Sequence, residues 1–180
     1  MRTLQLSIVL GLLTGALGCG NASAPYRATN TTQSIEGLAT ADELAIRQAI
    51  EDYANGFIQE DMQMLLDLWD TVNSSSVTYV AAELDQPIVG VTNLAPYYQS
   101  FLDTLIIKSG NISNLQIFQT GDTAYAFCNY TWVYENRPAS AELVQPTRAT
   151  FVLVKRNGHW LYQHFHESIS FEYEPPTSLR

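Results

Sequence analysis

The chain has 180 residues, of which 46% are hydrophobic and 11% aromatic. This composition excludes an intrinsically disordered chain and leaves room for one domain with a core. The formal net charge of −9 argues against nucleic acid as a partner, because its phosphates would be repelled. It also argues against a basic patch that binds anionic lipids, so membrane contact is expected only through an anchor.

The first residues have the pattern of an export signal. A positively charged start precedes the apolar stretch Leu4–Leu17, which is shorter than the about 20 residues of a membrane-spanning helix. We favour a lipoprotein-type signal peptide at 1–19, because a small residue precedes Cys19 as in a bacterial lipobox. Cys19 would then carry lipid and anchor the exported chain to a bacterial membrane. Alternatively, cleavage after Ala22–Ala24 would leave a periplasmic or secreted protein.

Three further segments complete the expected organisation. Residues 20–39 are rich in Asn, Ser, Thr and Ala and are expected to form a flexible polar tether. Residues 40–170 form the folded domain, and residues 171–180 are expected to be a frayed tail. Either cleavage leaves Cys128 without a disulfide partner, so its strand-like surroundings predict a small buried hydrophobic residue.

The first half of the domain has helical periodicity. Thr40 and Glu43 form a capping-box pair, and the helix that they begin carries apolar residues at helical spacing. Asp61 can cap a second, short helix, and Thr92 can begin a third. A short run of β-branched and aromatic residues at Val77–Ala81 predicts a strand between the last two helices.

In the second half the hydrophobic period changes to two, which predicts antiparallel strands. These are expected at Ile112–Gln119, Thr123–Glu135, Arg148–Arg156 and His159–Ile169. The pair Asn157-Gly158 favours a two-residue type I′ hairpin between the last two strands.

The turn predicts the pairing of the last two strands. Arg156 would face His159, and counting outward places Phe151 opposite His164, Ala149 opposite His166 and Arg148 opposite Glu167. His164 and His166 would then share one face with Phe151, Trp160 and Tyr162. We expect this face to look into the space between the sheet and the helices.

Two runs in the last hairpin, together with this order of elements, resemble the nuclear transport factor 2-like superfamily. The runs are Lys155–Trp160 and His164–Ser168, and Arg148–Thr150 matches the start of the penultimate strand in bacterial relatives. The resemblance is greatest to SnoaL-like-3 proteins and to the association domain of calcium/calmodulin-dependent kinase II. It implies an α+β fold with a cone-shaped, curved antiparallel sheet wrapped around N-terminal helices, and it implies a homodimer.

Two departures limit what the resemblance implies about activity. A pocket arginine of the kinase association domain falls at Phe151, so carboxylate binding does not carry over. Tyr53 lies where ketosteroid isomerases have their oxyanion-hole tyrosine, but their catalytic aspartate would fall near Val80 and Ala81. Because Glu83 is the nearest carboxylate, the sequence does not predict an isomerase.

The candidate ligand-binding residues are large aromatic residues and the paired histidines, namely Tyr53, Trp69, Tyr79, Trp132, His164 and His166. Each has a structural alternative, as a core aromatic residue or as a hydrogen-bonded buried histidine. Arg148 and Glu167 are expected to form a cross-strand ion pair, or else to hold a ligand carboxylate. A metal site is not expected, because His159 would lie about 17 Å from His164 along the strand. No cofactor is expected either.

Two functions remain open from the sequence. The first is a cavity that binds a small apolar or aromatic ligand, with weak catalysis as an option, in an exported protein. The alternative is a non-enzymatic dimerisation module with a vestigial pocket. In either case a homodimer is expected through the outer face of the sheet, because both faces of the last hairpin are apolar and one helical layer covers only one of them.

Overall fold

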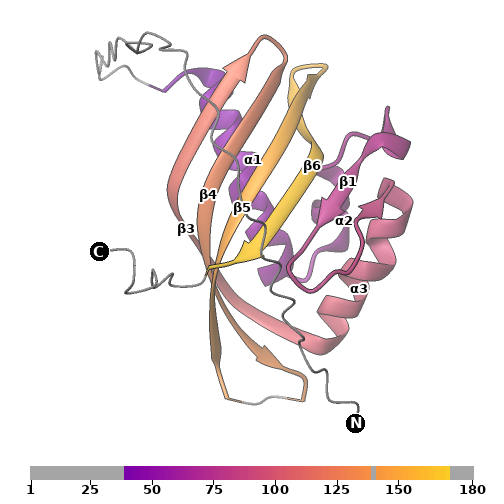
Figure 1. Ribbon diagram of the computed structural model, residues 1–180, viewed down its shortest axis with the longest axis vertical. Helices are drawn as coiled ribbons and strands as arrows, with labels where there is room; N and C mark the ends of the chain where they lie inside the picture. Colours follow the sequence, from indigo (N-terminus) through magenta and orange to yellow (C-terminus); the bar gives the residue numbers. More distant parts are fainter. Residues whose placement is uncertain (1–38, 139–140, 171–180) are drawn as a thin grey trace, which may run out of the picture. The chain divides into compact units, whose positions relative to one another are not determined.

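The computed structural model describes residues 39–138 and 141–170. The signal peptide with Cys19, nearly all of the tether and the C-terminal tail therefore lie outside the described residues. Within the described part, a six-stranded sheet in the order β2-β1-β6-β5-β4-β3 packs against helices (Figure 1). This arrangement confirms the α+β class. No helix in the described part is long and apolar enough to span a membrane.

The three helices occur in the predicted segments, although the third begins at Leu94, after a 3-10 turn, and not at Thr92. They are α1 (Ala41–Ile58), α2 (Met62–Asp67) and α3 (Leu94–Thr104). Thr40 accepts from the backbone N–H of Glu43, whose carboxylate accepts from the backbone N–H of Thr40, so the capping box is confirmed. Asp61 caps α2 by accepting from the backbone N–H of Met64. The buried face of α1 lies against the sheet.

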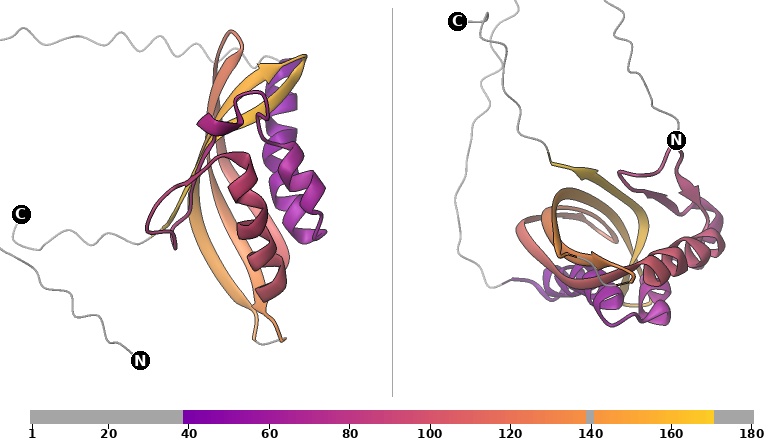
Figure 2. Two further views of the ribbon diagram at one scale, coloured as in Figure 1. Left: turned by 90° about the vertical axis from the view of Figure 1, so that its right-hand side faces the viewer. Right: turned by 90° about the horizontal axis from the view of Figure 1, so that it is seen from below.

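The strands are β1 (Thr78–Val80), β2 (Ile88–Val89), β3 (Leu105–Thr120), β4 (Thr123–Asn136), β5 (Leu143–Arg156) and β6 (His159–Ile169). Three of the long strands, β3, β4 and β5, extend beyond the predicted ranges, whereas the last strand has the predicted bounds and the first is shorter than predicted. The long strands pair antiparallel, as predicted, whereas β1 pairs with β6 in parallel. The sheet is curved, and α1 and α3 lie on one of its faces (Figure 2). The opposite face, called the outer face below, is turned toward the viewer in Figure 1.

A β-bulge changes the predicted register of the last hairpin. The pairing follows the prediction from Arg156 and His159 as far as Leu153 and Tyr162. Gln163 is then an extra residue, and Val152 pairs with His164. The predicted pairings beyond the bulge are therefore wrong. The observed partners are Phe151 with Phe165, Thr150 with His166, Ala149 with Glu167 and Arg148 with Ser168.

The bulge is held by the segment that follows α2. The backbone of Tyr162 donates to the carbonyl of Leu68 and accepts from the N–H of Asp70. The side chain of Gln163 donates to Asp70 at 3.3 Å, and the guanidinium of Arg156 donates to the same carboxylate oxygen. Asp70 is fully buried, so these donors satisfy a carboxylate that would otherwise be costly to bury. Because one extra residue reverses the facing of a strand, His164 and His166 turn outward and Glu167 turns inward.

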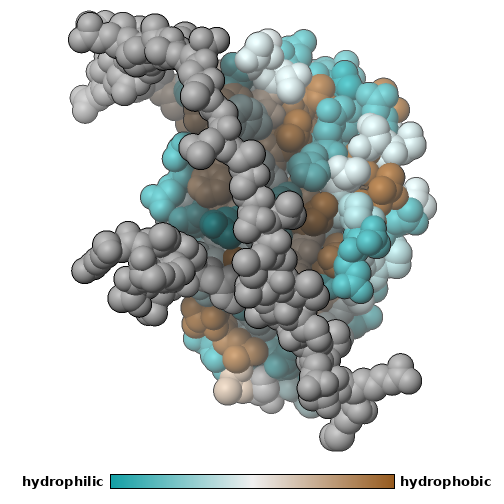
Figure 3. Space-filling model, in the orientation of Figure 1, coloured by the Kyte–Doolittle hydropathy of each residue, from teal (hydrophilic) through white to brown (hydrophobic). Residues whose placement is uncertain are grey.

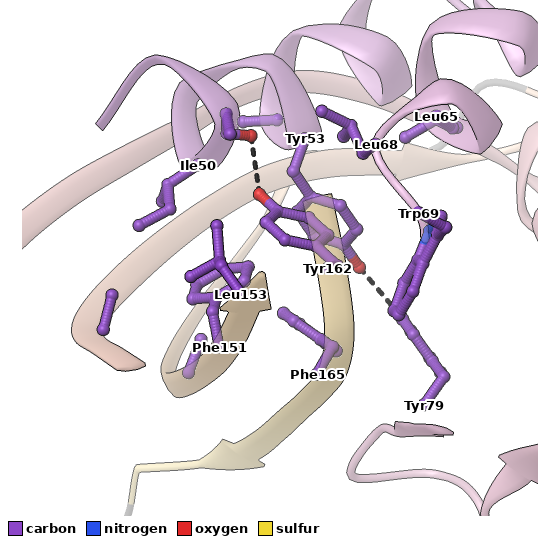
Figure 4. Packing of buried hydrophobic residues seen from close by; sticks show 14 of the residues in the cluster. Ile50, Tyr53, Leu65, Leu68, Trp69, Tyr79, Phe151, Leu153, Tyr162 and Phe165 are labelled. Atoms are coloured by element: carbon purple, nitrogen blue, oxygen red, sulfur yellow. Dashed lines mark hydrogen bonds between the residues drawn. The ribbon is translucent and has the colours of Figure 1, made fainter. Parts of the chain in front are cut away.

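Aromatic residues dominate the core between α1 and the sheet (Figure 4). Buried tyrosine hydroxyls need partners, and two of them bond to carbonyls of α1. Tyr162 donates to Ala49 at 2.6 Å, and Tyr130 donates to Ile50 at 2.8 Å. Cys128 is buried beside them, where burial raises the pKa of its thiol to about 12. The thiol is therefore inert at neutral pH, in line with the prediction of a buried hydrophobic residue.

Candidate functional site

A cavity of about 360 Å³ opens at the end of the sheet where β4 ends and β5 begins. This volume is in the range of small-molecule sites. Its aromatic lining comes from two helices and two strands, namely Tyr53, Phe57, Tyr79, Phe101, Trp132 and Tyr134. Its polar lining includes Glu83, Gln145, Thr147 and Glu167.

The carboxylate of Glu167 lies half-buried in the wall of this cavity. Its Oε1 accepts from the indole Nε1 of Trp132 at 2.8 Å and from the hydroxyl of Thr147 at 2.5 Å. In the part of the chain that the structure describes, no donor reaches Oε2, and no fully buried side-chain oxygen lacks a partner. Oε2 therefore faces the cavity.

Burial raises the pKa of Glu167, the hydrogen bonds from Thr147 and Trp132 oppose this rise, and the negative charge of Glu83 adds to it. A carboxyl group with a raised pKa and one free oxygen can accept a hydrogen bond, hold a cation or exchange a proton with a ligand.

Two tyrosines add a second polar group to the cavity. The hydroxyls of Tyr53 and Tyr79 lie 2.8 Å apart (Figure 4). Burial raises the pKa of both well above the ordinary value, so both are neutral. One hydroxyl donates to the other, and a further hydrogen bond links Tyr79 to Tyr97, whose hydroxyl donates to Glu83; the pair is therefore part of a chain of hydroxyl groups that ends at a carboxylate.

Glu83 lies exposed at the mouth of the cavity, in the loop between β1 and β2. The hydroxyl of Tyr97 in α3 donates to its Oε1. Burial, followed by this hydrogen bond and the charge of Glu83, raises the pKa of Tyr97. The bond joins the loop to α3, so it fixes one side of the entrance.

The structure brings together only part of the predicted ligand-binding set. Tyr53, Tyr79 and Trp132 line the cavity, as the candidate set requires. Trp69 does not: it is buried, donates to the hydroxyl of Tyr98 at 3.2 Å and packs edge-on against Tyr162. Its place is in the core.

The prediction that the paired histidines face the helices is wrong, because the bulge turns them to the outer face. Nδ1 of His164 lies 2.7 Å from the hydroxyl of Thr78, and the rings of His164 and His166 are 6.5 Å apart. Burial, and then the neighbouring His166, lower the pKa of His164. Among the described residues, no cluster of three or more His, Cys, Asp or Glu side chains is placed to hold a metal ion.

The predicted ion pair between Arg148 and Glu167 is also wrong. Arg148 is exposed, and its guanidinium donates to the carbonyl of Ile169 at 3.4 Å. Glu167 is on the opposite face of the sheet, with Trp132 and Thr147. The predicted register placed Glu167 on the other face of the sheet, beside Arg148, so the sequence pattern does not predict it as a cavity residue. One signal in the sequence points to the inward position of Glu167. Phe165, an apolar residue between two histidines, favours the core face, and Glu167, two residues further along the strand, shares that face.

Residues 46–172 match the family model of the SnoaL-like domain. The chain belongs to the SnoaL-like family. Among curated proteins, none matches the sequence.

Several solved structures share the fold of this SnoaL-like domain. A candidate dehydratase of the nuclear transport factor 2-like family from Streptomyces avermitilis is 17% identical, with a TM-score of 0.64 over 73% of this chain and 98% of that chain. A ketosteroid isomerase-like protein from Erwinia carotovora atroseptica is 16% identical, with a TM-score of 0.63 over 74% of this chain and 100% of that chain. A candidate calcium/calmodulin-dependent protein kinase II association domain from Xanthomonas campestris is 20% identical, with a TM-score of 0.61 over 76% of this chain and 91% of that chain. At these identities the likeness shows the fold alone.

Proposed function

We propose that this SnoaL-like domain binds a small, mainly apolar ligand in the cavity, with the polar group of the ligand at Glu167. The observation that carries the proposal is a carboxylate with one free oxygen in a wall of aromatic side chains. A cavity with apolar walls and few polar groups is the usual form of a small-molecule site. The polar groups set the orientation of the ligand, and the aromatic walls supply most of the contact area.

Oε2 of Glu167 is also the atom best suited to proton transfer. A carboxyl group whose pKa is raised toward neutrality can act as general acid or general base. The other oxygen is fixed by two donors, which hold Oε2 in one position. Weak catalysis by proton exchange with a bound ligand is therefore part of the proposal.

A cavity-filling variant tests the binding function. Ile107 lines the cavity, whereas its neighbour Ile106 is half-buried and lies outside it. Ile107→Trp should fill the entrance and remove any ligand that mass spectrometry detects on the purified wild-type protein, and Ile106→Trp is the matched control. Equal retention by both variants would place the ligand elsewhere.

The outer face of the sheet favours a second candidate function, dimerisation. One row of side chains crosses all six strands on this face, namely Phe118, Tyr125, Val152, His164, Thr78 and Val89. Phe118 and Tyr125 stack at 4.6 Å and are about half exposed, at 47% and 50%. Where Figure 3 shows this face, hydrophobic residues lie among hydrophilic ones.

Sedimentation velocity tests the homodimer. The wild-type protein at tens of micromolar, the range of weak contacts, should sediment as a dimer, and Tyr125→Glu should sediment as a monomer. A monomeric wild-type protein would refute the dimer and leave the cavity proposal untouched.

We further propose that the protein is exported and carries lipid at Cys19. The support is the sequence pattern alone. Intact-mass analysis of protein extracted from membranes tests it, because lipid adds mass to a chain that begins at Cys19. A mature chain that begins at Pro25 without lipid would refute the anchor.

A further inference from the structure

We propose that the ligand of this cavity is a small organic cation, whose ammonium group lies between Glu167 and the aromatic walls. This inference rests on the proposed binding function and specifies the chemical class of the ligand. It follows from the charges around the cavity, the chemistry of the walls and the free oxygen of Glu167.

The charge that faces the cavity is negative. Among the described residues, Glu83 and Glu167 are the lining residues with carboxylates, and no Lys, Arg or His lines the cavity. The charge of Glu167 also acts on Tyr53, Tyr79, Tyr130 and Cys128. Burial raises the pKa of each of these groups, so they are neutral. A ligand anion would be repelled, and a ligand cation would be attracted.

Basic residues close to the lining residues have partners outside the cavity, and Arg148 lies on the outer face, where it donates to the carbonyl of Ile169. Lys108 follows a lining residue of β3, but its ammonium lies 3.4 Å from the carboxylate of Glu135. Arg137 donates to the carbonyl of Leu105 at the rim and forms an ion pair with Glu60. Neither cation therefore neutralises Glu167.

The walls suit a cation that carries apolar groups. Aromatic faces attract ammonium groups through the ring quadrupole, most strongly when water is excluded. Phe101 and Tyr134 line the cavity and are only partly buried, so their rings are open to a ligand, whereas Trp132 and Tyr53 present little of their surface, at 9% and 2% exposed. Both donors to Glu167 bond to the same oxygen, Oε1, and Oε2 is left to face the ligand.

A pair of isosteric probes tests the sign of the charge. Benzyltrimethylammonium and 2,2-dimethylpropylbenzene have the same shape and differ in charge, and phenylacetate serves as an anion. Isothermal titration calorimetry on the wild-type protein should show at least tenfold tighter binding of the cation than of the neutral probe, and no binding of phenylacetate.

Two variants connect this preference to Glu167. Glu167→Gln keeps an oxygen for the bonds from Trp132 and Thr147 but removes the charge. It should lower the affinity for the cation at least tenfold and leave that for the neutral probe unchanged. Glu142→Gln is the matched control, because Glu142 is exposed and outside the cavity, and it should change neither affinity.

The outcomes separate the two proposals. If the neutral probe binds the wild-type protein as tightly as the cation does, or if phenylacetate binds more tightly than the cation, the proposal of a cationic ligand is refuted and the proposed cavity function stands. The same holds if Glu167→Gln binds the cation as tightly as the wild type does. If neither charged probe binds at millimolar concentration and the neutral probe does not bind up to its solubility in water, both the cation proposal and the binding function are refuted.

Discussion

Gly110 in β3 packs against Trp132 of the cavity wall, and Gly110→Ala tests how tightly this wall is packed. A Cβ at this position would lie 2.5 Å from Cζ3 of Trp132 and 2.9 Å from Cβ of Ala54. Trp132 has little room to move, because its ring stacks on Tyr130 at 4.6 Å and its indole N–H donates to Glu167. Ala54 is part of α1 and moves only with the helix.

The expected loss of stability combines two opposing effects. Inserting a methyl group into a packed core costs about 1–3 kcal/mol, and replacing glycine by alanine in an allowed conformation returns about 0.4–1 kcal/mol through the unfolded chain. Gly110→Ala should therefore lower the free energy of unfolding by about 1–2 kcal/mol. Urea unfolding followed by far-ultraviolet circular dichroism measures the change.

A double-mutant cycle isolates the clash with Trp132. In a Trp132→Phe background the smaller ring frees space. Gly110→Ala should then lower the free energy of unfolding by about half as much, and the remaining loss comes from the contact with Ala54. Gly121→Ala is the control, because its Cβ would meet nothing within 4 Å but its φ is +57°. Its cost should be the same in both backgrounds. An unchanged cost of Gly110→Ala in the Trp132→Phe background would refute the packing argument.

Two further predictions concern carboxylates. Asp70→Asn should lower the free energy of unfolding by about 1–3 kcal/mol. Urea unfolding measures this loss, with the exposed Asp67→Asn as the control. Equal losses in the two variants would show that the bulge does not depend on the charge of Asp70. Burial opposes ionisation of Asp70, but the bonds from Arg156 and Gln163 lower its pKa, so its contribution should be lost as the pH falls through the folded-state pKa. Burial raises the pKa of Glu167, so the free energy of unfolding should fall as the pH rises through that pKa. Melting temperatures measured against pH should show this fall for the wild-type protein and not for Glu167→Gln.

Local signals account for the parts of the fold that the sequence predicts correctly. Thr40 and Glu43 begin α1 because the capping box needs only residues three apart. Asn157-Gly158 sets the turn, since both residues adopt positive φ, 52° and 86°, as a type I′ hairpin requires. The match to the SnoaL-like family confirms the fold that these runs resemble.

The bulge at Gln163 was not predictable from local pattern. Its partner Asp70 lies 93 residues earlier in the chain, and no sequence period reports such a contact. The strand also carries apolar residues on both faces, including Leu161 and Tyr162, so a shift of one residue leaves the pattern looking the same. The candidate site depends on this shift, because it decides whether Glu167 or His166 faces the cavity.

The position of Glu167 goes against what folding alone favours. Its strand neighbours on the same face, Phe165 and Ile169, are apolar, and an apolar residue at 167 would avoid the cost of burying a carboxylate. Trp132 and Thr147 offset part of this cost at Oε1, yet Oε2 has no donor within the described residues. A carboxylate that a fold fixes through one oxygen in a cavity wall, with the other oxygen open, is characteristic of a functional site, where a ligand can supply the partner. The bulge that turns Glu167 inward is secured by Asp70, a fully buried carboxylate, so the fold uses one fully bonded carboxylate to position another whose Oε2 is open to the cavity.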